Sequence, residues 1–475
     1  MRHLLVVLSV AGLLASVGCG GGGGGNSPGT TAGCSSTSLP LAQQLRNPVS
    51  KFAVDNNGVI ISLPQVNAGG AGTTSGALIF GIGTSGNNGT TIGTVAATVL
   101  PIDTNCNLVG NTCANPVYTG IATRFNGVTY PNSTNAALSS VIDSGTSVLL
   151  FLDTTTTGIP NCGSAQNNYY CPNTPDALTA VNMGANSTPQ VTTAFTVTDD
   201  RNLLTSKVAL SDLAAPVSPG NPTGSTQQAD GFFDWGLPFF YGRNVYTAIQ
   251  GFTASGTAGP YFGYNGTVAA ISPPPTAPNG AAAANVAPLI IDGGPVAGVI
   301  ANNVAYTSVT ICQPGSSSNC QTIDHIAVDT GSTGLRVLAS ALPSSLLSAL
   351  PNVNPAAPVA ACVQFLDQSF FWGSLRVADV KMGGPFNNAE VASSLPVHIL
   401  GDPAFPTIPS SCSTVTTVSG TQTSGTEEDT VTQLGANGLI GLGPTQFECD
   451  LYGQISGVTN GCVNSAPPGV YYTCH

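Results

Sequence analysis

The stretch "HIAVDTGSTGLRVL", residues 325–338, decides how this sequence is interpreted. Its apolar run ends at Asp329, passes through Thr-Gly-Ser and becomes apolar again. A second stretch, "SVIDSGTSVLLF" at residues 140–151, repeats the design around Asp143. In both, we expect a strand to deliver the Asp to a sharp turn, in which Gly lets the backbone double back.

Two turns of this kind, residues 143–146 (the Asp143 turn) and residues 329–332 (the Asp329 turn), predict a pair of cooperating carboxylates. Chance alone would give about 0.1 matches to Asp-[Ser/Thr]-Gly-[Ser/Thr] in a chain of this composition. Gly permits close approach of the opposite turn, and the hydroxyls are placed to hydrogen-bond the carboxylates and that turn. The predicted catalytic residues are Asp143 and Asp329, and the predicted supporting residues are Ser144, Gly145, Thr146, Thr330, Gly331 and Ser332.

Paired carboxylates have a defined chemistry. Two carboxyl groups forced together in partly desolvated surroundings do not both ionise readily, so they share one proton and titrate as a coupled pair. One then acts as a general base on a bridging water, while the protonated partner polarises a peptide carbonyl. The expected reaction is acid-favoured amide hydrolysis without a covalent intermediate, and no cofactor or metal is expected.

The composition of the 475-residue chain favours a mostly β fold. Charged residues make up only 7%, and short apolar runs alternate with Gly, Asn, Pro and Ser clusters at the spacing of strands and turns. Only residues 339–350, "ASALPSSLLSAL", look helical. "GIGTSG", residues 81–86, matches a dinucleotide-binding pattern, but the residues after it favour a glycine-rich hairpin over a helix.

Residues 1–19 resemble an export signal of the lipoprotein type. Arg2 precedes an apolar run that is too short to span a bilayer comfortably. "SVGC", which ends at Cys19, resembles a bacterial lipobox, in which the Cys is acylated; the alternative is an ordinary secretory signal cleaved nearby. Residues 20–33 then form a flexible Gly-rich tether. We expect a bacterial cell-envelope protein, lipid-anchored at the outer membrane, that contacts the membrane through this lipid only.

Charge and cysteine content narrow the range of partners. The net charge of −12, with few Lys or Arg, argues against nucleic acid. The 13 cysteines leave an even number besides Cys19. Thiolate metal sites are the alternative to disulfides, but no pair has the two-residue gap of a zinc knuckle, and the four scattered His residues are given no role. The predicted disulfides are Cys106 with Cys113, Cys162 with Cys171, Cys312 with Cys320 and Cys449 with Cys462 from proximity, and Cys362 with Cys412 and Cys34 with Cys474 from elimination.

A Pro/Ala-rich segment, residues 271–288, divides the chain into halves of similar size and is expected to be a linker. The first half, residues 34–270, carries the Asp143 turn. The second half, residues 289–475, carries the Asp329 turn. Each half therefore supplies one carboxylate.

The surroundings of the two turns resemble the pepsin-like aspartic protease superfamily. "VDTGSTGLRV", followed by "ANGLIGLGPT" at residues 436–445, is similar to the first lobe of that superfamily. "VIDSGTSVLLF", followed by "DWGLPFFYGRNVYTAIQG" at residues 234–251, is similar to the second lobe. The resemblance implies a bilobed, mostly β, aspartic-protease-like double-psi β-barrel architecture, with a peptide or protein substrate in the cleft between the lobes. The lobes stand in the opposite order, which identifies the chain as a circular permutant.

Other segments resemble an uncharacterised family of bacterial lipoproteins with a domain of unknown function. They include "NPVSKFAVDNNGVIISLP", "FDWGLPFFYGR" and "FFWGSLRVADVKMGG", and the resemblance covers nearly everything from Cys34 to His475. In that family the half with the Asp329-type turn comes first. A permutation is tolerated where the original termini lie close together. Cys34 and Cys474 are expected to hold the new ends together.

The resemblance also has a departure. The region that matches the superfamily's flap, residues 364–384, has no Tyr, and the flap candidates Phe365, Phe371 and Trp372 supply a ring without a phenol. Two functions therefore compete. One is an envelope-anchored aspartic-type peptidase that hydrolyses peptide bonds through a water activated by the paired aspartates. The other is a non-catalytic lipoprotein that binds peptide or glycan at the cell surface, with the Asp turns kept as scaffold. Substrate, pH optimum and oligomeric state stay open.

Overall fold

The chain forms a mostly β protein, as the composition predicts. The computed structural model describes residues 33–92, 95–102, 120–130, 139–162, 169–217, 231–265, 283–365, 368–384, 389–416, 422–448 and 470–474. Among them, strand β24 (Ser369–Met382) has 14 residues, whereas the longest helix, α3 (Ser344–Ala349), has six. The helix expected over residues 339–350 is confirmed in shorter form, as a 3-10 turn (Ala339–Ala341) followed by α3. The other α-helices are α1 (Thr154–Thr157), α2 (Leu237–Phe240), α4 (Ser410–Ser413) and α5 (Val431–Leu434).

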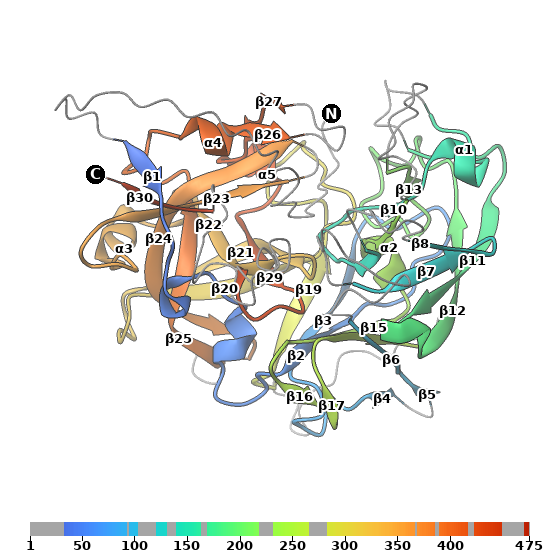
Figure 1. Ribbon diagram of the computed structural model, residues 1–475, viewed down its shortest axis with the longest axis horizontal. Coiled ribbons are helices and arrows are strands. Elements are labelled where there is room, and N and C mark those ends of the chain that lie inside the picture. Colours follow the sequence, from blue (N-terminus) through green and yellow to red (C-terminus); the bar gives the residue numbers. More distant parts are fainter. Residues whose placement is uncertain are drawn as a thin grey trace, which may run out of the picture.

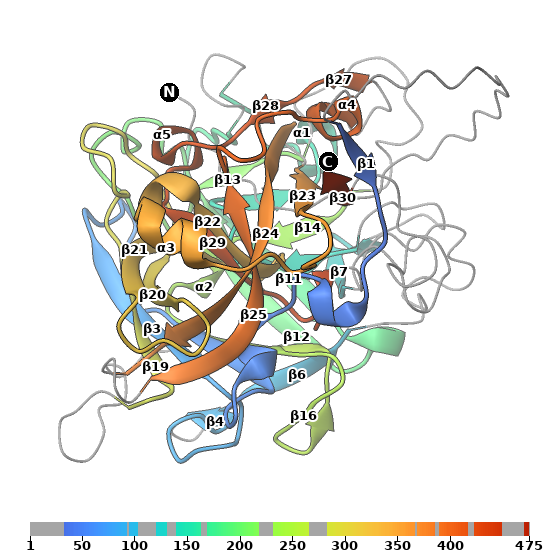
Figure 2. The same ribbon diagram turned by 90° about the vertical axis from the view of Figure 1, so that its left-hand side faces the viewer.

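A closed six-stranded barrel forms the body of the C-terminal half. Each strand pairs with the next, and β24 pairs back onto β20, which closes the ring. Figure 2 shows two long strands of this barrel, β24 and β25, with α3 beside the barrel. In order around the ring, the strands are β20 (Tyr306–Cys312), β21 (Cys320–Asp329), β29 (Gly438–Leu442), β22 (Thr333–Leu338), β25 (Glu390–Leu400) and β24.

The N-terminal half contains two smaller sheets besides the strands that it contributes to the connecting sheet described below. The first carries the Asp143 turn, and its strands in spatial order are β13 (Ala214–Ala215), β10 (Leu149–Phe151), β14 (Phe233–Trp235) and β9 (Val141–Ile142). The second is antiparallel, in the order β12 (Gln190–Val197), β11 (Asp176–Met183), β7 (Ala122–Phe125) and β8 (Val128–Tyr130).

An antiparallel sheet connects the two halves. In Figure 1 it runs between the orange C-terminal half and the green part of the N-terminal half. Strand β19 joins it to the barrel through a single register pair, Ile290 with Tyr306. The order continues from β19 (Val286–Ile291) through β3 (Thr74–Phe80), β2 (Gly58–Ser62), β15 (Asn244–Ala248) and β18 (Tyr261–Tyr264) to β6 (Thr98–Pro101). One hydrophobic cluster contains residues of both halves and of this sheet.

The strands around the two Asp turns have the same local topology. In the C-terminal half, β29 lies between β21 and β22, parallel to β21 and antiparallel to β22. In the N-terminal half, β14 lies between β9 and β10 in the same orientations. A fourth strand then pairs in parallel, β25 with β22 and β13 with β10. In each half, the strand that leads to the Asp therefore pairs with a strand from much later in the chain, β9 with β14 and β21 with β29.

The first and last described strands both lie on the C-terminal half. Strand β1 (Cys34–Ser36) pairs with β30 (Tyr471–Cys474), which pairs with β23 (Val359–Gln364). The segment after β1 stays on this half, since Asn47 donates its side-chain amide to the carbonyl of Gly443 at 2.9 Å. Cys34 faces Cys474 in register, and the two form a disulfide. The pairing predicted by elimination is therefore confirmed.

Three further predicted disulfides are present, and the other two predicted pairs lie outside the described residues. Cys162–Cys171, Cys312–Cys320 and Cys362–Cys412 are bonded as expected. The pairs Cys106–Cys113 and Cys449–Cys462 lie outside the described residues, as do the signal segment, Cys19 and most of the tether.

Two further sequence expectations can be compared with the strands. The last three residues of the predicted linker, residues 286–288, already belong to β19. After "GIGTSG", turns and the two-residue strand β4 (Thr91–Ile92) follow, and no helix does within the described residues. Because β3 pairs with β2 and β19, whereas β4 pairs with β5, the segment is a turn between strands that do not pair with each other. The small remaining strands are β5 (Val95–Ala96), β16 (Thr253–Ala254), β17 (Thr257–Ala258), β26 (Thr414–Thr416), β27 (Gln422–Ser424) and β28 (Thr426–Glu427). In the part of the chain that is described, no helix has the length and apolar character to cross a bilayer.

Candidate active site

The two Asp turns hold their carboxyl groups in the same way. Asp143 follows β9 and Asp329 ends β21, and both side chains are fully buried. In each turn the Gly two residues later donates its backbone N–H to Oδ1 of the Asp at 2.7 Å. The hydroxyl three residues later donates to Oδ2, from Thr146 at 3.0 Å in one turn and from Ser332 in the other.

Ser144 and Thr330 lock the turns to each other through reciprocal hydrogen bonds. The N–H of Ser144 donates to Oγ1 of Thr330 at 2.9 Å, and the N–H of Thr330 donates to Oγ of Ser144 at 3.1 Å. Each hydroxyl also donates to the carbonyl just before the opposite Asp. Ser144 reaches the carbonyl of Val328 at 2.8 Å, and Thr330 reaches that of Ile142 at 3.0 Å. These four bonds join the two halves directly behind the carboxyl groups.

The glycines allow each turn to lie against the opposite carboxyl group. A Cβ on Gly145 would lie 2.6 Å from Oδ1 of Asp329, and one on Gly331 would lie even closer to Oδ2 of Asp143. Real Cβ atoms do not approach oxygen this closely, so Ala at either position forces the turns apart. The two carboxyl groups lie close enough for each to change the pKa of the other. The structure thus brings together all the residues that the sequence predicted as catalytic or supporting.

Burial raises the pKa of both paired carboxyl groups. It raises the pKa of Asp143 well above its usual value, and the negative charges of Asp329 and Asp234 raise this pKa further. Burial also raises the pKa of Asp329, but hydrogen bonds from Asp143, Ser332 and Gly331, followed by the positive charge of Arg336, act in the opposite direction. The two carboxyl groups therefore lie close together but differ in how readily each one ionises.

Asp234 is a third buried carboxyl group that the sequence interpretation did not assign to the site. It comes from β14, and Thr146 Oγ1 lies 2.8 Å from its Oδ2. Its Oδ1 is buried without a hydrogen-bond partner. Burial raises the pKa of Asp234 well above the usual value, the Thr146 bond lowers it, and the charge of Asp329 raises it. The available signal was a lone Asp inside the aromatic run "GFFDWG".

Arg336 is a buried cation in the C-terminal half that was also missed. It pairs with the equally buried Glu448, and its Nη1 donates to the carbonyl of Thr333 at 3.0 Å. Tyr471 donates its hydroxyl to the other oxygen of Glu448 at 2.8 Å. His398 faces Arg336 in register on β25, and burial, followed by the charge of Arg336, lowers the pKa of His398 well below its usual value. His398 is therefore a neutral core residue.

The flap candidates lie in hydrophobic clusters of the C-terminal half. Phe365 and Phe371 pack edge to face, with ring centroids 4.5 Å apart, in a cluster with Leu338 and Leu400. Trp372 lies in another cluster, and its indole N–H donates to the carbonyl of Phe405 at 2.9 Å. No described contact joins any of the three rings to the two carboxyl groups. Their position does not support a flap role, which stays a prediction.

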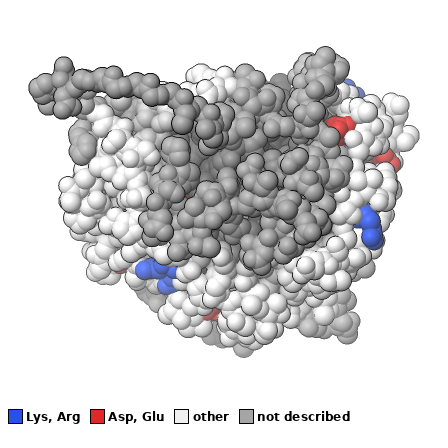
Figure 3. Space-filling model, viewed as in Figure 1, with Lys and Arg blue, Asp and Glu red and all other residues white. Residues whose placement is uncertain are grey.

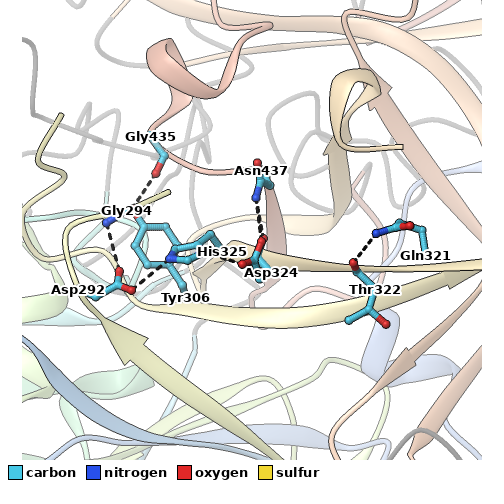
Figure 4. Close-up of polar contacts among 9 residues, drawn as sticks. All are labelled: Asp292, Gly294, Tyr306, Gln321, Thr322, Asp324, His325, Gly435 and Asn437. Atoms are coloured by element: carbon cyan, nitrogen blue, oxygen red, sulfur yellow. Dashed lines mark hydrogen bonds and ion pairs between the residues drawn. The ribbon is translucent and has the colours of Figure 1, made fainter. Parts of the chain in front are cut away.

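A second polar cluster supports the strand that delivers Asp329. Figure 4 shows His325 between Asp292 and Asp324, with the ring of Tyr306 alongside. Its Nε2 lies 3.1 Å from Oδ2 of Asp292, and its Nδ1 lies 3.2 Å from Oδ2 of Asp324, off line for a hydrogen bond. The backbone of His325 is in the left-handed region, with φ at 49°, opposite a register shift in β20. Because Asn437 donates its N–H to the carbonyl of His325 at 2.9 Å, the cluster holds β21 at this bulge.

The described surface offers few charges and one group with metal-ligand geometry. On the face in Figure 3, charged side chains stand singly among neutral ones. Within the described ranges, Cys162, Cys171 and Asp199 are close enough to share an ion. The two cysteines form a disulfide, which leaves no thiolate for a metal.

The fold and the site together define a class of protein. It is a mostly β protein with a closed barrel and two interlocked, buried Asp turns. The chain belongs to the family described as "Protein of unknown function (DUF3443)", which matches residues 27–264 and 281–475. The predicted membership of an uncharacterised family is confirmed. A comparison with curated proteins found no match.

Proposed function

We propose that this protein is an aspartic-type peptidase of the cell envelope, in which Asp143 and Asp329 activate a water molecule to hydrolyse a peptide bond. The observation that carries the proposal is the reciprocal bonding of Ser144 and Thr330, which holds the two Asp turns against each other. Burying one carboxyl group against another lowers the stability of the fold. Arrangements with such a cost in stability are concentrated at functional sites.

The proposed reaction is an acid–base hydrolysis in which the two carboxyl groups have complementary roles. The ionised carboxyl group removes a proton from water, and the oxygen of that water attacks the peptide carbonyl carbon. The protonated carboxyl group donates to the carbonyl oxygen, and a proton then passes to the leaving nitrogen as the C–N bond breaks. Gly145 and Gly331 let each turn lie against the opposite carboxyl group, and the Ser144–Thr330 bonds hold the turns together.

The architecture is proposed to be pepsin-like and circularly permuted. The matching strand order around the two Asp turns supports a double-psi arrangement with one copy in each half. The pairing of β1 with β30 supports adjacent original termini, and the family match is interrupted at residues 265–280, within or beside the Pro/Ala segment. A chain that starts at residue 283, continues from residue 475 into residue 34 and ends at residue 265 should then fold with the same disulfides. Failure of this rearranged chain to fold would count against the permutation.

A non-catalytic peptide- or glycan-binding protein is the second candidate. It is favoured by the complete burial of both carboxyl groups and by Phe365 in the region where the resemblance expects a flap Tyr. In this case the two turns act as a scaffold that joins the halves. A peptidase, unlike such a binding protein, requires the carbonyl group of a substrate to reach the two carboxyl groups.

The deciding experiment is cleavage of a complex peptide mixture by residues 20–475 between about pH 3 and pH 7. Asp143→Asn and Asp329→Asn are the test variants. Asp176→Asn, at the start of β11 in the second sheet of the N-terminal half, is the matched control for the same chemical change. We expect each test variant to lose cleavage by about 10³-fold or more, and the control to keep it.

The outcomes separate the two functions. Cleavage that both site variants abolish supports the peptidase. Cleavage that survives either change excludes this pair as the catalytic dyad. A folded chain that binds peptides without cleaving them, and does so equally well in both variants, supports the binding protein.

The lipid anchor is a separate proposal. Acylation at Cys19 would tether the protein to a membrane. Cys19→Ser should move the protein from the membrane fraction to the soluble fraction of the envelope. Unchanged membrane association in this variant would contradict the anchor.

A further inference from the structure

The two halves differ in charge at two equivalent positions. Because β14 and β29 occupy equivalent places beside the two turns, their residues can be matched through register. Asp234 faces Val141, two residues before Asp143, and Leu439 faces Ala327, two residues before Asp329. Asp234 and Leu439 are therefore counterparts. The N-terminal half has a buried acid where the C-terminal half has an apolar residue.

The second difference lies on the partner strand. Leu150 faces Asp234, and Arg336 faces Leu439. Leu150 and Arg336 are thus counterparts, each seven residues after the Asp of its own turn. An extra acid accompanies Asp143, and an extra cation accompanies Asp329. The hydrogen bonds inside the two turns are equivalent. The two carboxyl groups therefore differ in the charged residue that accompanies each of them, an acid beside Asp143 and a cation beside Asp329.

Thr146 connects the extra acid to the pair. Its Oγ1 lies 3.0 Å from Oδ2 of Asp143 and 2.8 Å from Oδ2 of Asp234. A hydroxyl has one proton, whereas an ionised carboxylate only accepts hydrogen bonds. Both contacts are hydrogen bonds only if one of the two carboxyl groups is protonated and donates to Thr146. The bridge therefore requires a proton in addition to the one shared between Asp143 and Asp329.

Arg336 is the cation that acts on the site. Its guanidinium is paired with Glu448, Tyr471 donates to Glu448, and His398 beside it is neutral. Its charge acts on Asp329 and favours ionisation there. Among the described residues no cation acts on Asp234, and one of its oxygens is buried without a partner. Ionisation is therefore least unfavourable at Asp329 and most unfavourable on the side of Asp143 and Asp234.

We propose that the three buried carboxyl groups hold two protons at neutral pH, one on Asp143 and one on Asp234, with the single negative charge on Asp329. Asp234 donates to Thr146, Thr146 donates to Asp143, and Asp143 donates to Asp329. For the catalytic roles this inference rests on the proposed function. It makes Asp329 the general base and Asp143 the acid. When Asp143 gives up its proton, the Thr146 proton moves to Asp143 and the Asp234 proton moves to Thr146, so the charge passes to Asp234.

The test is a carbon-13 titration of the full folded chain labelled in the Asp carboxyl groups, which needs no turnover. At about pH 7 we expect two buried Asp signals at the position of a protonated carboxyl group. One should vanish in Asp143→Asn and the other in Asp234→Asn, whereas Asp329→Asn should remove an ionised signal. A single protonated group, or a protonated signal that belongs to Asp329, overturns the assignment. If a variant fails to fold, the same signals are assigned in the unchanged chain through their bonded backbone carbons.

A second variant tests the role of Arg336. Arg336→Leu combined with Glu448→Gln removes both buried charges and gives the C-terminal half the apolar residue of its counterpart. The titration midpoint of Asp329 should rise by about one pH unit or more. An unchanged midpoint in a folded double variant removes Arg336 from the proposal. Because the titration counts protons and the cleavage assay measures turnover, failure of either one leaves the other result standing.

Discussion

The N-terminal and C-terminal halves build the same turn on different supports. The Asp329 turn rises from a closed barrel whose flank is fastened by β30 and β1. The Asp143 turn rises from a four-stranded sheet backed by aromatic rings, in which Phe233 stacks on Phe151 at 5.2 Å and on Trp235 at 5.4 Å. The hydrogen bonds inside the turns are nevertheless equivalent. Turn geometry therefore depends on the local Asp-[Ser/Thr]-Gly-[Ser/Thr] sequence, whereas charge preference depends on the neighbouring strands.

The largest expected difference between the halves comes from Arg336 and its counterpart Leu150. Arg336→Met leaves Glu448 buried without a cation, which should lower the free energy of unfolding by about 3 to 5 kcal/mol. Leu150→Met conserves volume and should cost less than about 1.5 kcal/mol. Chemical denaturation of both variants measures the difference. Equal losses would contradict the buried ion pair.

Ser144 and Thr330 should, in contrast, behave alike. Ser144→Ala and Thr330→Val each leave an opposing N–H and carbonyl without their partner, so each should cost about 2 kcal/mol of unfolding free energy. Ser348→Ala, at an exposed position of helix α3, is the control and should change little. Denaturation curves that differ by more than about 1 kcal/mol between the two site variants would show that the lock is one-sided.

Asp234 should make stability fall as the pH rises. Its folded pKa is raised, so the folded state holds a proton that the unfolded chain releases above about pH 4, and stability is lost from there up to the folded pKa. Asp234→Asn lacks this loss. Relative to the unchanged chain, the variant should gain about 1 kcal/mol or more of unfolding free energy between pH 4 and pH 7. A constant difference across that range would contradict a proton on Asp234.

His398 should have the opposite and smallest effect. Its folded pKa is lowered, so its contribution is complete above about pH 6.5 and is lost as the pH falls below that value. His398→Phe should remove this loss and flatten the acid side of the stability curve by about 1 kcal/mol per pH unit or less. Thermal unfolding at several pH values between about 4 and 7 measures it. Parallel curves for the variant and the unchanged chain would mean that His398 does not titrate on unfolding.

The sequence predicted the parts of the site that depend on neighbouring residues. An Asp followed by a hydroxyl residue and Gly specifies a turn, and two such turns in separate halves predicted the pairing of Asp143 with Asp329. The roles of the flanking hydroxyls were predicted for the same reason. The Cys34–Cys474 disulfide was predicted because the other cysteines were already paired.

The rest depends on register between distant strands. Asp234 reaches the site because β14 inserts between β9 and β10, about ninety residues after Asp143 in the chain. Arg336 and Glu448 meet across a similar separation. In one dimension each is a single charged residue among apolar ones, which gives no sign of its partner. Phe365 was expected over the site because it lies in the region that matches the superfamily's flap. In the structure it packs against Phe371 in a hydrophobic cluster.

The disulfide between β1 and β30 turns the described chain into a covalent ring. A protease that cuts one peptide bond between Cys34 and Cys474 opens the ring but releases no fragment, because both pieces stay joined through sulfur. Such a nicked molecule keeps its mass until it meets a reductant, and then separates into two pieces. Outside the cell, where disulfides persist, a single cut would therefore leave the molecule in one piece.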